Sequence, residues 1–217
     1  MGNAEVGIVT RDHLRLPPST TFQLGAYVGR FSSAVILALV PDHPVFVVEE
    51  IPNYHYVGDG EIELAGMTTV EWGESVVRMM QFYTHRVGCA AWVDPDTEFS
   101  KDMKRCKLRL RPNHNHGPEL RTEVLREYFH DNKIFFTPWL KVLPYEIQRA
   151  QWPAEESSAY HVRMTGSDYS LSALEQVISR RPEAVSLIPS QQPTFLSRLQ
   201  HERGIAIVKT DPHLGGM

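Results

Sequence analysis

The sequence predicts a mixed α/β fold for this 217-residue chain. Three β-rich runs lie close together in residues 21–31, 32–40 and 44–51, and the turn-forming PDHP joins the last two. Amphipathic patterns and short apolar runs then alternate toward the C-terminus. Three successive strands predict an antiparallel meander, and the helices between the later strands allow these to pair in parallel with it.

The first helix is expected in residues 68–87. Thr68 and Glu71 fit an N-terminal capping box. Apolar side chains then recur at roughly helical spacing: Val70, Val76, Val77, Met80 and Tyr83. The apolar run CAAWV, residues 89–93, follows as a buried strand, and the helix before it allows a right-handed crossover into the sheet.

Strands and helices continue to alternate after residue 93. Leu alternates with Lys and Arg in KLRLR, and Pro118 is placed to open a helix. The expected elements are a strand at 107–111, a helix at 118–131, a short strand at 133–139, and helices at 143–152 and 167–181. We expect an arm or linker in residues 1–18, one folded domain in 19–182 and a C-terminal tail in 183–217.

Composition excludes several functional classes. The net charge of -4 and the pI near 6.2 provide no global basic field, so contact with nucleic acid requires a local patch. Cys89 and Cys106 match no zinc spacing and no disulfide framework, which suits a reducing cytosol. The sequence has no phosphate loop and no apolar run of bilayer length, so we expect no membrane span and assign any ATP use to a partner or another region.

Two aspartates occupy positions where α/β proteins often place their chemistry. Asp94 follows the predicted strand at 89–93, and side chains of neighbouring strands converge at such an end. Asp168 begins the helix at 167–181, where the helix dipole favours the ionised carboxylate that a hard cation needs. Each has a plain alternative: Asp94 can belong to an ordinary strand-to-loop turn, and Asp168 can simply cap its helix.

A basic segment follows the first of these acids. Its candidate DNA contacts are Lys104, Arg105, Lys107, Arg109 and Arg111. Neutralising phosphates with such cations gives affinity that does not depend on sequence. The alternative is a solvated edge strand that Lys and Arg protect from aggregation. His114 and His116, two apart in the next loop, are better explained as surface residues than as zinc ligands.

Residues 16–182, read together, resemble the C-terminal nuclease domain of the large subunit of tailed-phage terminases. The resemblance rests on the order and spacing of GAYVG, SSAVILALVPDHPVFVVEE, MTTVEWGESVVRMM, AAWVDP, ELRTEVLREYFHDNKIFFTPWLKVLPYEIQRAQWP and SDYSLSALEQVISRRP. It implies an RNase H-like fold. It also implies a divalent-metal-dependent endonuclease that cleaves concatemeric DNA during packaging, with two Mg²⁺ or Mn²⁺ ions that stabilise the attacking and leaving oxygens.

The resemblance also implies which acidic residues bind the metal ions. Asp94 and Asp168 match the second and third metal-binding carboxylates, and Glu50 matches an acid that is frequent at the end of its strand, although a solvated strand end explains Glu50 as well. The first strand departs from the family pattern GxDxG, because GAYVG places Tyr27 where the acid belongs, or Ala26 if the alignment shifts by one. A phenol is a poor ligand for a hard dication, so the site is expected to be impaired.

The sequence is compatible with three functions. The first is the nuclease, with double-stranded DNA, the terminase ATPase region, the small subunit and the portal as partners, in the cytoplasm of an infected host cell. The second is a degenerate RNase H-like module that binds DNA or docks the packaging motor without cutting. The third is another RNase H-like enzyme, such as a resolvase, which is expected to lack the stretch 119–153.

Overall fold

A six-stranded mixed sheet forms the centre of the molecule. The computed structural model describes residues 16–58, 60–94, 97, 100–114, 117–150 and 168–180. The strands of this sheet are β1 (Thr21–Tyr27), β2 (Ser33–Leu39), β3 (Val45–Pro52), β6 (Cys89–Val93), β7 (Leu108–Pro112) and β8 (Ile134–Phe136). They lie side by side in the order β7-β6-β1-β2-β3-β8.

The directions of the strands are mixed as the sequence predicted. The first three strands form the antiparallel meander, and β6 pairs with β1 in parallel. β7 continues in parallel beside β6, and β8 lies parallel to β3 at the other edge. The predicted fold class is therefore confirmed: an α/β fold whose meander and parallel strands are consistent with an RNase H-like sheet.

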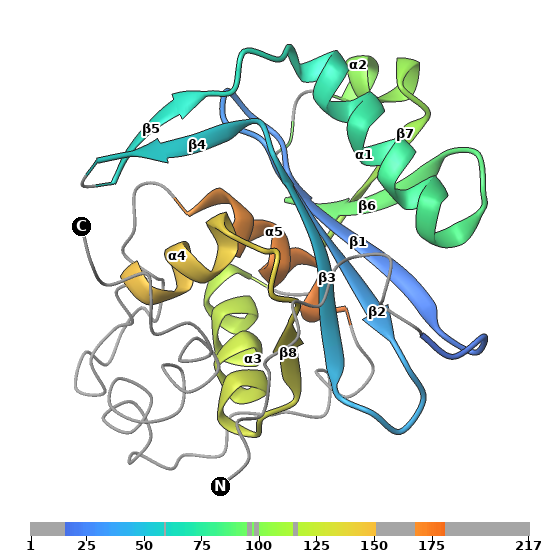
Figure 1. Cartoon of the computed structure of the whole chain (residues 1–217), viewed down its shortest axis with the longest axis vertical. Helices are drawn as coiled ribbons and strands as arrows, with labels where there is room; N and C mark the ends of the chain where they lie inside the picture. Colours follow the sequence, from blue (N-terminus) through green and yellow to red (C-terminus); the bar gives the residue numbers. More distant parts are fainter. Residues whose placement is uncertain are drawn as a thin grey trace, which may run out of the picture.

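Helices cover both faces of the sheet (Figure 1). α1 (Thr69–Thr84) and α2 (Ser100–Arg105) lie on one face, over a core that includes Trp72 and Met103. α3 (Pro118–His130), α4 (Val142–Arg149) and α5 (Tyr169–Ile178) lie on the other. The inward side of α5 was predicted correctly, because Leu171, Leu174, Val177 and Ile178 are fully buried.

The central helix α5 packs directly on β1. A Cβ added to Gly25 would lie 2.1 Å from the carbonyl oxygen of Ala173 and 2.9 Å from Val177. No side chain fits there, so glycine sets how closely the helix approaches the strand. The first glycine of GAYVG therefore has a packing reason in this fold.

Most predicted elements are present, and the structure adds a hairpin and a helix that were not predicted. Thr68 and Glu71 form the expected capping box at the start of α1. The segment between β3 and α1, for which no element was predicted, forms a hairpin of β4 (Tyr54–Val57) and β5 (Glu61–Leu64). The helix α2 was not predicted either. β7 begins at Leu108, and Lys107 takes a left-handed conformation before it, so Lys107 does not share the strand with the other two cations as expected.

Two predicted segments lie wholly or almost wholly outside the described residues. The proposed tail at 183–217 and almost all of the arm at 1–18 lie outside the described residues. Among the helices that are described, none is both long and apolar enough to cross a bilayer.

Candidate functional site

One edge of the sheet gathers the polar residues that the sequence singled out. Gly25 of β1 pairs with Trp92 of β6, and both face the layer of α3, α4 and α5. Two residues further along each parallel strand, Tyr27 and Asp94 reach the carboxyl end on this same face. We call the end of the sheet formed by Tyr27, Asp94 and the start of α5 the Asp94 edge.

Asp168 reaches the Asp94 edge from the other side of β1. It is the residue before α5. The next side chain, Tyr169, packs on Tyr27 with ring centroids 4.9 Å apart. Ser170 then shares a 2.7 Å hydrogen bond with Ser33 of β2, the residue opposite Tyr27 in the sheet. Asp94 and Asp168 therefore flank Tyr27, with Asp94 on the β6 side and Asp168 on the β2 side.

Ala26 and Tyr27, the two positions that the resemblance offered for a first-strand acid, face opposite sides of the sheet. Ala26 is fully buried in the opposite core, under α1. Tyr27 faces the Asp94 edge and packs in an aromatic cluster with Tyr169, which also stacks on Phe31 and contacts Tyr54. Tyr27 is thus the side chain that occupies the position between the two aspartates.

The carboxylate of Asp94 is held by an arginine. Arg121 of α3 donates a 2.8 Å hydrogen bond from Nη2 to Oδ2 of Asp94. The Arg121 side chain is 5% exposed and that of Asp94 is 39% exposed, so the guanidinium is buried while the carboxylate reaches the surface. The ion pair orients Asp94 and offsets its charge.

Glu50 lies elsewhere. It pairs with Val35 of β2, so three strand spacings, roughly 14 Å, separate it from β6. Its Oε1 accepts hydrogen bonds from the backbone N–H groups of Lys141 and Val142, and its Oε2 accepts one of 2.6 Å from Leu143. Burial raises the pKa of Glu50 above its ordinary value, although the backbone hydrogen bonds act in the opposite direction. Glu50 therefore caps the start of α4.

A buried carboxyl that the sequence did not single out lies beside Asp168. Oε1 of Glu146 in α4 accepts hydrogen bonds from Tyr54 at 2.5 Å and Tyr56 at 3.0 Å, and its Oε2 accepts one of 2.8 Å from the backbone N–H of Leu171. Burial raises the pKa of Glu146 to about 7, and the charge of Asp168 adds to that shift. The network ties the β4–β5 hairpin to α4 and to the first turn of α5.

The alternating sequence of β4 is a signal from which the two tyrosines that donate to Glu146 could have been identified. Tyr54 and Tyr56 alternate before the glycines of the turn, Gly58 and Gly60, which both have positive φ. No comparable sequence signal marks Glu146, because its burial depends on the contact between α4 and α5.

The predicted DNA contacts fall on different faces. Arg109 pairs with Ala90 and Arg111 with Trp92, so both point to the α5 face, and both are exposed. Lys104 and Arg105 belong to α2, which packs with α1 on the opposite face. Lys107 lies in the turn between α2 and β7. The basic segment is therefore not one continuous patch.

The described residues fit a divalent ion only in part. Asp94 and Asp168 offer the hard oxygen ligands that Mg²⁺ and Mn²⁺ prefer, but Tyr27 supplies no carboxylate between them. Asp96 and Glu98, which could substitute for it, lie outside the described residues, as does His116. The described donor set thus lacks the third carboxylate of the two-ion site that the sequence resemblance implies.

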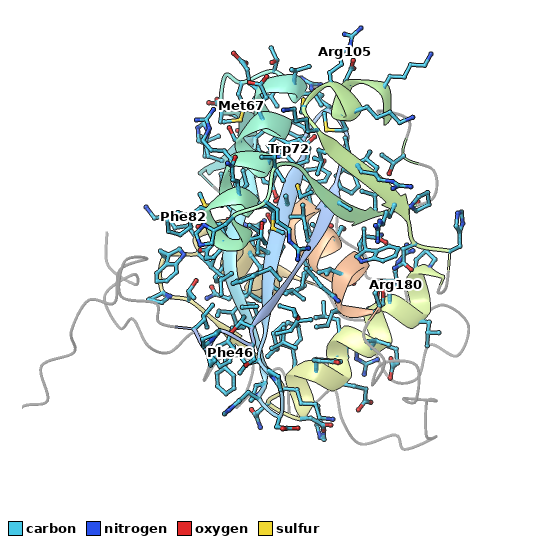
Figure 2. The ribbon with its side chains drawn as sticks, turned by 90° about the vertical axis from the view of Figure 1, so that its right-hand side faces the viewer. Phe46, Met67, Trp72, Phe82, Arg105 and Arg180 are labelled. Carbon is cyan, nitrogen blue, oxygen red and sulfur yellow. The ribbon has the colours of Figure 1, made fainter. Side chains whose placement is uncertain are left out.

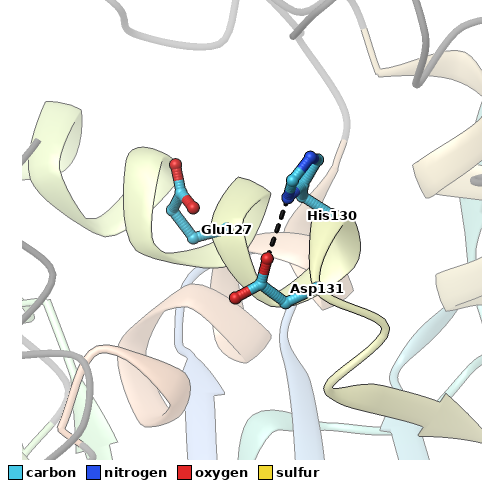
Figure 3. Close-up of side chains that lie close together, drawn as sticks. All are labelled: Glu127, His130 and Asp131. Atoms are coloured by element: carbon cyan, nitrogen blue, oxygen red, sulfur yellow. Dashed lines mark hydrogen bonds and ion pairs between the residues drawn. The ribbon is translucent and has the colours of Figure 1, made fainter. Parts of the chain in front are cut away.

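A second group of candidate ligands is found at the end of α3. Among the described residues, Glu127, His130 and Asp131 alone form a group of three potential ligand atoms within 4.8 Å of one another (Figure 3). Asp131 already accepts hydrogen bonds from His130 at 2.8 Å and Lys133 at 2.6 Å. His130 and Asp131 are exposed, and acidic groups of this kind are common without an ion. Asp131 of this group is therefore a suitable control for substitutions at the Asp94 edge.

The chain matches no protein-family model, no curated protein and no solved structure.

Proposed function

We propose that this chain is the RNase H-like nuclease domain of a viral genome-packaging terminase, a divalent-metal-dependent endonuclease with a weakened site that acts on double-stranded DNA. One observation carries the proposal. Asp94 and Asp168, 74 positions apart in the sequence, reach the same edge and the same face of a mixed sheet of the expected fold class.

The residues of the Asp94 edge have distinct roles in this proposal. Asp94 and Asp168 would hold Mg²⁺ or Mn²⁺. The bound ion would supply Lewis-acid stabilisation of the phosphate oxygens and a more acidic water. Arg121 orients Asp94 through their 2.8 Å ion pair, and the Glu146 network fixes the first turn of α5 that carries Asp168. Tyr27 limits the number of anionic ligands and so the affinity for the ion.

A second candidate function is a module that binds DNA or docks the packaging motor without cutting. Two observations favour it. Tyr27 takes the place of the first-strand carboxylate, and the guanidinium of Arg121 already offsets the charge of Asp94. Because a hard dication is held by anionic oxygens, each of these lowers the expected metal affinity.

Digestion of supercoiled plasmid with Mn²⁺ or Mg²⁺ separates the two candidates. We expect slow nicking by the unmodified chain in Mn²⁺, a loss of at least about tenfold in Asp94→Asn and in Asp168→Asn, and a gain in Tyr27→Asp, because a third carboxylate strengthens metal binding. Asp131→Asn, in the exposed group of α3, is the matched control and is expected to leave nicking unchanged.

The outcomes point to different conclusions. Nicking by Tyr27→Asp alone favours the non-cutting module for the natural chain. Nicking that persists in both Asp94→Asn and Asp168→Asn contradicts the assignment of the metal ligands.

A further inference from the structure

A cationic surface surrounds Trp92 next to the Asp94 edge. The guanidinium carbon of Arg180 lies 4.3 Å from the centroid of the Trp92 ring, and that of Arg111 lies 5.8 Å from it. Both distances are within the range of cation–π interactions. Arg180 comes from the end of α5 and Arg111 from β7, so residues 69 positions apart meet on one aromatic side chain.

The support beneath these arginines is rigid. The side chain of Asn113, just after β7, donates hydrogen bonds to the carbonyl oxygen of Gln176 and to the hydroxyl of Ser179. Its backbone N–H donates to the carbonyl oxygen of Val93. These buried contacts lock the end of α5 to the ends of β6 and β7, so the positions of Arg111 and Arg180 are set before any ligand binds.

We infer that the surface formed by Arg109, Arg111 and Arg180 around Trp92 is the track on which this domain holds the phosphate backbone of double-stranded DNA, and that Lys104 and Arg105 on α2 lie off this track. The inference rests on the proposed function and deepens it. It adds Arg180 to the DNA contacts predicted from the sequence and removes Lys104 and Arg105 from them.

The geometry of the three arginines fits a phosphate backbone. Arg109 and Arg111 are two residues apart on an edge strand, which spaces their Cα atoms by roughly 6.5 Å along the strand. Each strand of a duplex presents one phosphate per roughly 3.4 Å of its axis, so neighbouring guanidinium groups can contact separate phosphates. Guanidinium groups also bind phosphate through two parallel hydrogen bonds.

The position of the track also agrees with the Asp94 edge. Trp92 precedes Asp94 by two residues on the same face, so a backbone held by Arg111 and Arg180 passes beside Asp94. Arg121 offsets the charge of Asp94, which would otherwise repel the phosphates there. Lys104 and Arg105, in contrast, lie with α2 across the sheet, and Figure 2 shows Arg105 and Arg180 on separate parts of the molecule.

The salt dependence of DNA binding tests this assignment. Binding of the full chain to a 20-base-pair duplex is measured by fluorescence anisotropy over a series of NaCl concentrations. Two double variants remove the same charge: Arg109→Gln with Arg111→Gln on the track, and Lys104→Gln with Arg105→Gln on α2. All four side chains are exposed, so both variants are expected to fold, which circular dichroism checks.

The expected changes are in the slope of log K against log[NaCl]. Each phosphate contact contributes a slope of about -0.9, so the track variant should lose between about one and two units and the α2 variant almost none. Arg180→Gln should lose about one unit. Arg180→Lys should keep most of the slope because it keeps the charge, while its affinity falls because an ammonium cannot form the paired contact.

Equal losses of slope in the two double variants, or a larger loss in the α2 variant, contradict the track. They would still show that the chain binds DNA. The absence of any binding by the unmodified chain at low salt overturns the track together with the proposed function. The two failures are therefore distinguishable.

Discussion

Tyr27 packs in an aromatic cluster near Asp94 and Asp168, and these contacts give it a structural role. Its ring packs on Tyr169, which in turn contacts Phe31 and Tyr54. Aromatic pairs of this kind contribute about 0.5–1.5 kcal/mol each beyond the burial of their area. The sequence resemblance offered residues 26 and 27 as alternatives for an acid. Because consecutive side chains of β1 point to opposite faces, only Tyr27 is on the face of Asp94.

Asp94 should contribute to stability as well as to any metal binding. Asp94→Asn removes the 2.8 Å ion pair with Arg121, whose side chain is 5% exposed. We expect a loss of roughly 1–3 kcal/mol in the free energy of unfolding, moderated by the exposure of Asp94. Urea denaturation at pH 7 measures it.

Asp168→Asn is the comparison for that measurement. The charge of Asp168 opposes the ionisation of Glu146, so Asp168→Asn removes an unfavourable interaction. We therefore expect its effect on stability to be smaller. A larger loss in Asp168→Asn than in Asp94→Asn contradicts the role assigned to Arg121.

Glu146 should make the stability of the fold depend on pH. Its pKa is about 7 in the folded chain against an ordinary value of 4.5. The folded state thus binds the proton more tightly, so its stabilising contribution is complete below pH 4.5 and is lost as the pH rises through 7. The raised pKa of Glu50 acts in the same direction.

Chemical denaturation between pH 4.5 and 8 checks this. Glu146→Gln should flatten the decline in stability over that range, whereas Glu61→Gln, at an exposed position of β5, should leave it unchanged. A decline that is equally steep in Glu146→Gln shows that another group is responsible.

The contact between α5 and β1 determines where Asp168 lies. Gly25→Ala would place its methyl group 2.1 Å from the carbonyl oxygen of Ala173, so the helix has to move away from the strand. We expect a loss of roughly 1–3 kcal/mol or more, measured by thermal or urea denaturation. At Gly29 the nearest atom is a Tyr27 ring carbon at 3.2 Å, which can shift, so Gly29→Ala should cost less. Equal effects contradict the close approach at Gly25.

Local sequence signals predicted the elements that depend on local physics. The Thr68 and Glu71 pair marked the start of α1, Pro118 marked the start of α3, and apolar spacing marked the buried side of α5. The basic segment was harder to interpret. A cationic pattern looks the same in a strand and in a helix, so the sequence did not reveal that α2 separates Lys104 and Arg105 from β7.

The meander and the crossover to β6 were predictable for the molecule as a whole because strand spacing and a connecting helix limit the topology. The candidate site was predictable in part. Asp94 follows β6 and Asp168 precedes α5, but the ion pair with Arg121, the cap formed by Glu50 and the burial of Glu146 depend on contacts between segments far apart in the sequence. No local pattern encodes such contacts.

Binding of Mn²⁺, followed by isothermal titration calorimetry and by the shift in melting temperature, tests the account most directly. The unmodified chain should bind Mn²⁺ weakly at the Asp94 edge, Tyr27→Asp should bind at least about tenfold more tightly, and Asp94→Asn and Asp168→Asn should each abolish the response, while Asp131→Asn in the exposed group of α3 should not. A response that survives in both Asp94→Asn and Asp168→Asn, or that only Asp131→Asn removes, contradicts a metal site shared by these two aspartates.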